Sequence, residues 1–211
     1  MDAQTVLTTT RSVRKRVDFH RPVPRELLLE CLEVAVQAPT GGNTQEWAWV
    51  FVTDPEKKRA IGELYNKSWT AYSKSRGRPY AEDDPRVEQL PRIASSSQYL
   101  ADRMQEIPVM VIPCLEGRVD MAGVPNQVLA GFYGSILPAA WSFMLAARDR
   151  GVVGSWTTLH LKYERETADL LGIPYEKYTQ AALLALGFST GGEFKPAKRL
   201  PLDGIVHWDK W

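Results

Sequence analysis

The segment Ala38-Pro39-Thr40-Gly41-Gly42-Asn43-Thr44-Gln45-Glu46-Trp47 joins an amphipathic stretch to the apolar run Ala48-Trp49-Val50-Phe51-Val52. It predicts a helix, a tight polar turn and then a strand, because Pro, Gly and Asn favour turns and aromatic residues favour strands. A turn of this composition presents backbone N–H groups and short polar side chains at the mouth of a pocket. We therefore expect both the fold and the binding site to be organised around it.

A second polar cluster lies upstream of the turn. Thr10-Arg11-Ser12-Val13-Arg14 offers two guanidinium groups and a hydroxyl, and the planar fork of Arg suits phosphate because it donates two parallel hydrogen bonds. Basic residues near a terminus are usually a solvated face, but the turn and Arg199 together favour a binding role. The two clusters predict one ligand, with an anionic tail near Arg11 and a flat polar head near Asn43. Flavin mononucleotide (FMN) fits this description.

The rest of the chain predicts helices that alternate with strands. Helices are expected over 24–37, 55–72, 92–106, 127–150 and 164–171, and strands over 47–52, 109–115, 152–159 and 180–186. Such an order indicates an α+β (α/β layered) fold in a single domain, 1–211. Pro113 predicts an edge strand or a bulge, and Gly131, Gly134 and Pro138 predict close packing or a kink.

The polar segment 73–89 has two interpretations. The first is a solvated loop, since Lys, Arg, Gly, Pro, Asp and Glu dominate it. The second is a lid or substrate-binding loop, because long loops inside compact domains often have that role.

Composition excludes several classes of protein. A formal net charge of +1 over 211 residues argues against a nucleic-acid binder. The mainly apolar run Ile136–Ala147 is too short to span a bilayer, and the N-terminus shows no apolar leader. Cys31 and Cys114 are expected to pack as unpaired apolar groups. These features predict a cytoplasmic protein.

The sequence lacks the usual catalytic motifs. It has no Cys-x-x-Cys, His-Glu-x-x-His, Gly-x-Ser-x-Gly or Gly-x-Gly-x-x-Gly pattern, and its three histidines have no metal-ligand spacing. We expect no metal site and no catalytic side chain. If the chain is an enzyme, the reactive atoms belong to a bound cofactor.

With these motifs the chain resembles the nitroreductase family of FMN-dependent oxidoreductases. Family members commonly carry Arg-Arg-Ser-x-Arg followed by Ala-Pro-Ser-x-x-Asn-x-Gln-Pro-Trp, which the two clusters above match. The similarity continues through Gly151-Val152-Val153-Gly154-Ser155-Trp156 and Pro196-Ala197-Lys198-Arg199-Leu200-Pro201-Leu202, in order, over nearly the whole chain. Thr10 stands where the family commonly has its first Arg, and Trp141-Ser142 where it commonly has Gln-Asn.

The resemblance implies a mixed central sheet flanked by helices. It also implies a homodimer with the flavin at the interface and a C-terminal arm, 190–211, exchanged between subunits. The implied FMN contacts fall into four groups: the phosphate (Arg11, Ser12, Arg14, Arg199), the ring or ribityl chain (Pro39, Thr40, Gly41, Asn43), the reactive N5 edge (Gly154, Ser155, Trp156) and the pyrimidine edge (Gln98, with Tyr99).

The implied activity is transfer of hydride from NAD(P)H, through flavin N5, to a nitroaromatic, quinone or enone by a ping-pong mechanism. Trp69 and Tyr72 are candidates for an aromatic substrate slot. Two alternatives stay open: a flavin-binding carrier or sensor without turnover, and a sister chemistry such as reductive dehalogenation or flavin fragmentation.

Overall fold

An antiparallel sheet forms the centre of the fold in the computed structural model, which describes residues 1–75, 80–81 and 83–211. Its strands are β1 (Trp47–Val52), β2 (Val109–Glu116), β3 (Val152–Thr157), β4 (Tyr178–Gln180) and β5 (Leu183–Phe188). They run in the order β1-β2-β5-β3, and β4 also pairs with β2. Every ladder among the described residues is antiparallel. The mixed character expected of the sheet comes from one isolated parallel bridge, between Ser12 and Gly154.

Pro113 lies in a central strand, so the expectation of an edge strand was wrong. On one side of β2 it is opposite Trp49 of β1. On the other side, β2 pairs with β5 over Val109–Val111 and with β4 over Cys114–Glu116. Pro113 therefore falls where the partner strand changes, and its carbonyl accepts a hydrogen bond from Ala181 N. A missing N–H is tolerated at such a break in the ladder.

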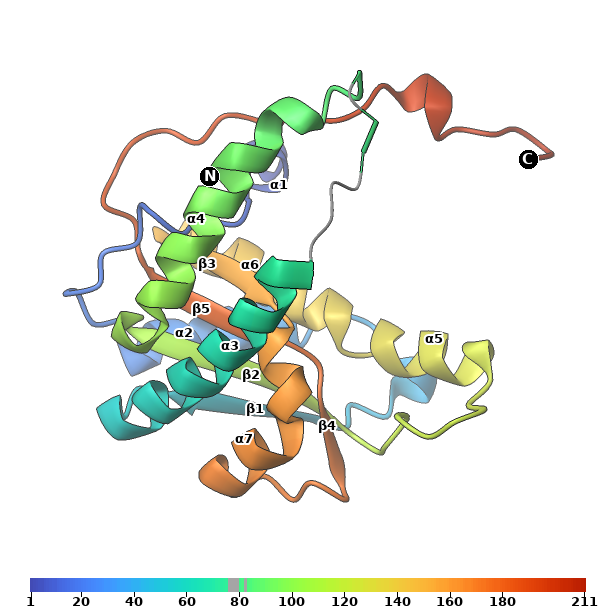
Figure 1. The fold of residues 1–211 in the computed structure, drawn as a ribbon. Helices are drawn as coiled ribbons and strands as arrows, with labels where there is room; N and C mark the ends of the chain where they lie inside the picture. Colours follow the sequence, from blue (N-terminus) through green and yellow to red (C-terminus); the bar gives the residue numbers. More distant parts are fainter. Residues whose placement is uncertain (76–79, 82) are drawn as a thin grey trace.

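Helices cover both faces of the sheet (Figure 1). They are α1 (Ala3–Thr9), α2 (Arg25–Ala35), α3 (Pro55–Ser75), α4 (Leu90–Asp102), α5 (Asn126–Gly134), α6 (Leu137–Asp149) and α7 (Glu164–Leu171). Alternate residues of β2 point to opposite faces. Val109 and Val111 join the core under α2 and α6, whereas Met110 and Ile112 join the core under α3 and α4.

The apolar stretch 126–150 forms two helices, α5 and α6, which Ser135 and Ile136 separate. By length and composition alone, Asn126–Asp149 is apolar enough to cross a membrane. Six residues of α6 are buried against the protein core, which accounts for the composition of that half. None of α5 is buried.

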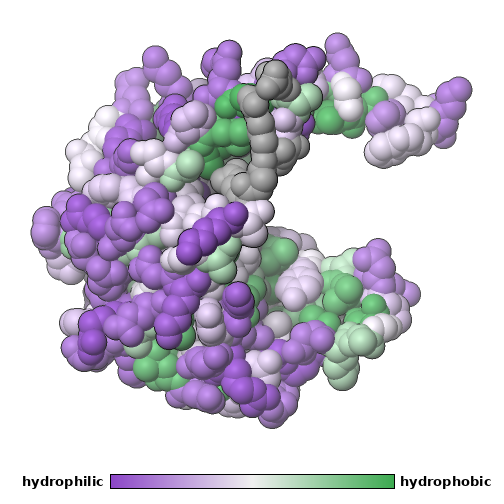
Figure 2. Space-filling model, viewed as in Figure 1, coloured by the Kyte–Doolittle hydropathy of each residue, from purple (hydrophilic) through white to green (hydrophobic). Residues whose placement is uncertain are grey.

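Helix α5 and the C-terminal segment both project from the body of the protein (Figure 1). Figure 2 shows the molecule hollowed between these two projections, with hydrophobic residues on the surface of both. The exposed apolar side chains include Val128 on α5 and Leu202, Ile205, Trp208 and Trp211 on the C-terminal segment.

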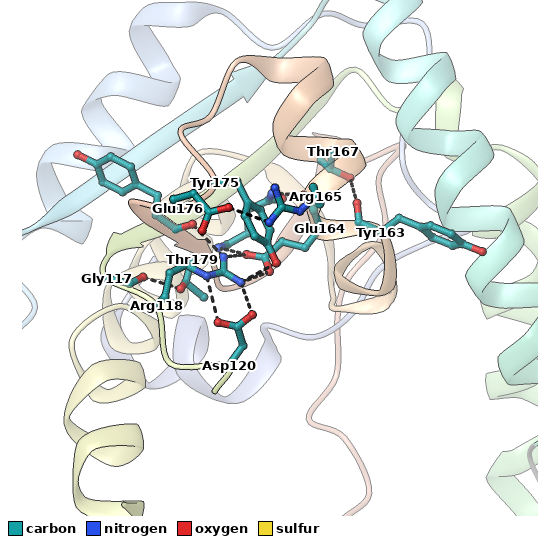
Figure 3. A network of polar contacts seen from close by, with 12 residues as sticks. Gly117, Arg118, Asp120, Tyr163, Glu164, Arg165, Thr167, Tyr175, Glu176 and Thr179 are labelled. Atoms are coloured by element: carbon teal, nitrogen blue, oxygen red, sulfur yellow. Dashed lines mark hydrogen bonds and ion pairs between the residues drawn. The ribbon is translucent and has the colours of Figure 1, made fainter. Parts of the chain in front are cut away.

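A polar network fixes the connection from β2 to α5 (Figure 3). The Arg118 guanidinium donates to Glu164 Oε1 at 2.9 Å, Asp120 Oδ2 at 2.6 Å and the Tyr175 hydroxyl at 2.9 Å. Burial lowers the pKa of Arg118, but its bonds to Asp120 and Glu164 outweigh that effect and raise it. Glu164 Oε1 also accepts from Gln180 N at 2.8 Å, so the network joins this connection to α7 and β4.

The segment 73–89 is described only in part. Helix α3 continues to Ser75, and a short 3-10 turn covers Val87–Gln89. Arg86 forms an ion pair with Asp84 at 2.6 Å. Residues 76–79 and 82, on which the expectation of a lid falls in part, lie outside the described residues.

Candidate functional site

The N-terminal motif lies against the end of the sheet. Val13 N donates to Gly154 O at 2.7 Å, and Ser12 forms the parallel bridge with Gly154. Two groups of predicted site residues, Arg11–Arg14 and Gly154–Trp156, are therefore neighbours although they are far apart in the sequence.

A cavity of about 340 Å³ opens beside this junction, between α3, α4 and the end of β3. It is lined by Arg14, Tyr65, Trp69, Tyr72, Ile93, Ser97, Leu100, Ser155, Trp156, Thr157, Thr158 and Leu159. Its walls combine aromatic rings with hydroxyl groups, and Arg14 is the charged residue among these lining side chains. Ser155 is fully buried, and its Oγ has no hydrogen-bond partner among the described residues. Such a cavity suits a flat aromatic ligand with polar edges.

Arg14 contributes an uncompensated charge to the cavity. Its Nη1 donates to Ser96 Oγ at 3.3 Å, and no carboxylate in the described part of the chain forms an ion pair with it. Burial lowers the pKa of Arg14, and the nearby Tyr65 partly opposes that change. A desolvated cation without a carboxylate is costly unless a ligand supplies the missing acceptor.

Arg11 belongs to a separate cluster of guanidinium groups. Its pKa is lowered by burial and by the charges of Arg92, Arg199 and Arg16. Arg11 Nη2 donates to Lys195 O, whereas Arg11 Nε is buried without a partner. None of the four arginines forms an ion pair with a described carboxylate, although a carboxylate pairs with each of six other arginines. The cluster has the charge and the donors that a phosphate group requires.

The predicted turn lies elsewhere. Gly41–Asn43 form a 3-10 turn beside α5, where Gly41 N donates to Ser135 Oγ at 2.9 Å. Gly42, Asn43 and Gln45 adopt positive φ angles of 57°, 56° and 55°. None of the predicted contact residues Pro39, Thr40, Gly41 and Asn43 lines the cavity. Within one chain, the structure does not bring the turn to the other predicted site residues.

Gln98 does not line the cavity either. Its Oε1 accepts from Trp69 Nε1 at 2.8 Å, and its Nε2 donates to Asp102 Oδ1 at 2.7 Å. The Gln98 amide thus links Trp69, one of the aromatic walls of the cavity, to Asp102. The neighbouring Ser97 lines the cavity instead.

Gly154 is required by the sheet. A Cβ at this position would lie 2.0 Å from the Ala185 carbonyl oxygen on β5. The absence of a side chain therefore allows β3 to pair closely with β5.

Sequence reasoning missed two features of the site. Tyr65, on the buried stripe of α3, lines the cavity, and its side chain is hydrogen-bonded to Thr157. Arg92 on α4 joins the cluster around Arg11. No motif surrounds either residue, so only the packing of α3 and α4 reveals them. Among the described residues, no group of His, Cys, Asp or Glu could hold a metal ion.

Comparison with known proteins gives the family. Residues 7–188 match the model of the nitroreductase family. NADH dehydrogenase of Thermus thermophilus is 30% identical over 99% of this chain and 96% of its own length. Iodotyrosine deiodinase 1 of Rattus norvegicus is 26% identical, covering 92% of this chain and 66% of that protein.

Solved structures have the same fold. Oxidized iodotyrosine deiodinase bound to FMN and 3-iodo-L-tyrosine has a TM-score of 0.71 at 22% identity, covering 98% of both chains. The FMN and NADPH-dependent nitroreductase NfnB from Sphigopyxis sp. strain HMH has a TM-score of 0.69 at 21% identity, covering 100% of both. The chain belongs to the nitroreductase family, as its motifs predicted.

Proposed function

From this family membership we propose that the chain is an FMN-dependent oxidoreductase. It transfers hydride from NAD(P)H, by way of FMN, to an electron-poor acceptor of the nitroaromatic, quinone or enone class. One observation carries the proposal: two groups lie at the two ends of the segment Arg11–Arg14, an arginine cluster and an aromatic cavity that contains Arg14, and neither has an ion-paired carboxylate among the described residues. These ends match the two chemical halves of FMN.

The arginine cluster would hold the phosphate. Arg11, Arg92 and Arg199 offer guanidinium donors whose positive charges repel one another until an anion is present. Each charge-assisted hydrogen bond contributes about 1.5–3 kcal/mol. Ser12 is exposed beside them and would add a hydroxyl.

Arg14 would contact the ring system, not the phosphate. The groups that shift its pKa do not include any arginine of the cluster, and it lines the aromatic cavity with Ser155 and Trp156. The buried Ser155 hydroxyl, which lacks a partner among the described residues, would bond a polar atom of the ring.

When bound, FMN supplies the redox chemistry by taking two electrons from the nicotinamide and passing them to the acceptor. Arg14 stabilises the negative charge that reduction places on the polar edge of the ring. Trp69 and Tyr72 both line the cavity, and their rings accept a planar substrate by stacking. Donor and acceptor use the same cavity in turn, which gives ping-pong kinetics.

The site is completed by a second copy of the chain. The turn Pro39–Asn43 lies beside α5, away from the cavity, so in the proposed homodimer it contacts the FMN of the partner. The hollow between α5 and the C-terminal segment receives that partner, and the two arms, 190–211, are exchanged (Figure 2). Exposed apolar surface of this kind marks an interaction site. We place the dimer in the cytoplasm, since Cys31 and Cys114 are buried and unpaired.

Spectroscopy and kinetics test the function. Protein mixed with FMN should retain it through gel filtration and show the flavin absorbance bands. Anaerobic addition of NADH or NADPH should bleach these bands, and a quinone or nitroaromatic should restore them. Double-reciprocal plots should be parallel. Failure to bind FMN would refute the proposal, and FMN that stays oxidised would identify a carrier or sensor.

Reductive dehalogenation is the second candidate. The 26% identity to iodotyrosine deiodinase 1 over 92% of this chain favours it. Release of iodide from 3-iodo-L-tyrosine by the reduced protein, at a rate above that with a quinone, would select this sister chemistry.

A further inference from the structure

Two further arginines extend the cluster around Arg11. The guanidinium carbon of Arg16 lies 3.8 Å from the centroid of the Phe194 ring, and that of Arg148 lies 4.6 Å from it. Phe194 is buried at the start of the C-terminal segment. One ring thus holds two cations, one from the N-terminal segment and one from the end of α6.

The charges form a row, not a compact group. Arg16 acts electrostatically on both Arg11 and Arg148. Burial lowers the pKa of Arg148, and the charge of Arg16 lowers it further. Arg148 is not among the charges that lower the pKa of Arg11, so Arg16 is the group that links Arg148 to the cluster around Arg11.

The far end of the row is unneutralised. The Arg148 side chain forms no hydrogen bond or ion pair with another residue in the described parts of the chain, and its Nε is buried. Within the described residues, the hydrogen bond that the Arg16 guanidinium donates goes to Glu193 O, at 3.2 Å. By contrast Arg150, close by in sequence, pairs with Glu30 at 3.2 Å. A phosphate monoester carries about −1.5 to −2 charges at pH 7, so one such group at Arg11 leaves the pair Arg16 and Arg148 unneutralised.

We infer that Arg16 and Arg148, held against Phe194, form a second phosphate-binding subsite distinct from that for the FMN phosphate. The ring holds both guanidinium groups in place, and their N–H groups are the donors that a phosphate ester requires. Two sources carry this group: the 2′-phosphate of NADPH and a free phosphorylated molecule. The first source rests on the proposed function, and the subsite itself does not.

The test uses FMN-loaded protein, in which the other phosphate position is occupied. Inorganic phosphate, titrated calorimetrically at constant ionic strength, should still bind. Arg148→Ala should weaken this binding about tenfold, the loss of one charge-assisted hydrogen bond, and Arg148→Lys should restore part of it. Arg21→Ala is the matched control, because the Arg21 guanidinium carbon also lies over a ring, 3.5 Å from the Phe188 centroid. The Arg21→Ala protein should bind phosphate as tightly as the unaltered protein. FMN content should be equal in all four proteins.

Loss of phosphate binding on FMN loading, or unchanged binding by Arg148→Ala, would overturn the inference while leaving the proposed function intact. If the protein takes up no FMN, the proposed function fails, and Arg148-dependent phosphate binding by the free protein still supports the subsite.

The KM values for NADPH and NADH distinguish the two molecules that could supply the phosphate group. A tenfold rise for NADPH but not NADH in Arg148→Ala identifies the 2′-phosphate, and unchanged KM values identify a free phosphorylated molecule.

Discussion

Replacing Arg14 by Ala separates the two ends of the proposed FMN site. Arg14 lies in the cavity and Arg11 in the arginine cluster. Loss of one charge-assisted hydrogen bond costs about 1.5–3 kcal/mol, so FMN affinity should fall about tenfold to 150-fold in either variant. Fluorescence titration of FMN measures this loss. Affinity alone does not distinguish the two arginines.

The reduction potential does distinguish them. Arg14 is proposed to face the edge of the ring that becomes negative on reduction, so its removal destabilises the reduced form more than the oxidised form. If that difference equals one charge-assisted bond, the midpoint potential should fall by about 30–60 mV, at about 30 mV per 1.4 kcal/mol for a two-electron couple. Arg11→Ala should leave the potential unchanged, because the phosphate keeps its charge.

Stability supplies the third measurement. Burial already disfavours the charged form of Arg14, so Arg14→Ala should not lower the melting temperature of the FMN-free protein. Lys57→Ala, at an exposed position of α3, is the control and should change none of the three quantities. An unchanged potential in Arg14→Ala, or a melting temperature that falls together with FMN affinity, would show that Arg14 has only a structural role.

Three other changes test the fold and the assembly. Gly154→Ala should destabilise the protein by about 3 kcal/mol or more in urea unfolding, because its Cβ would lie 2.0 Å from a carbonyl oxygen of β5; Gly134→Ala, with open space around it, should be nearly neutral. Deletion of Leu202–Trp211 should yield a monomer that loses FMN, and a truncated FMN-loaded dimer in sedimentation would contradict the proposed arm exchange. Burial lowers the pKa of His160 to about 4, against the partial opposition of Gln180. Between about pH 6.5 and 4 the unfolded state therefore binds the extra proton. The free energy of unfolding should therefore decrease as the pH is lowered from about 6.5 to about 4. His160→Gln should reduce this pH dependence, which is measured from unfolding midpoints at several pH values.

Local signals predicted the elements whose boundaries are set locally. The strand Trp47–Val52 and the helix Glu164–Leu171 were confirmed, and Gly172 ends that helix at a left-handed φ of 72°. Tertiary pairing decided the rest. The expected strand 180–186 is divided between β4 and β5, because β2 changes its partner there. No local pattern records that exchange.

The same distinction applies to the site. Motifs identified Arg11, Arg14 and Ser155 as candidates, since their residue types carry the chemistry in a recognisable order. Arg92 and Tyr65 have no such context, because they approach the others only after α3 and α4 pack on the sheet. The order of the motifs also predicted that Arg11 and Arg14 both bind the FMN phosphate. Because a strand-like segment alternates its side chains, we propose instead that Arg11 and Arg14 contact different halves of the ligand.

The distance of the turn from the cavity links cofactor affinity to assembly. In the proposed dimer each FMN contacts the cavity of one chain and the turn Pro39–Asn43 of its partner, so a monomer offers only part of the site. Binding that requires the dimer must stabilise the dimer by the same free energy. FMN should therefore tighten self-association, and dilution below the dimer dissociation constant should release it. The apolar side chains left exposed on α5 and the C-terminal segment follow from the same arrangement, since surface reserved for a partner cannot also be buried within one chain.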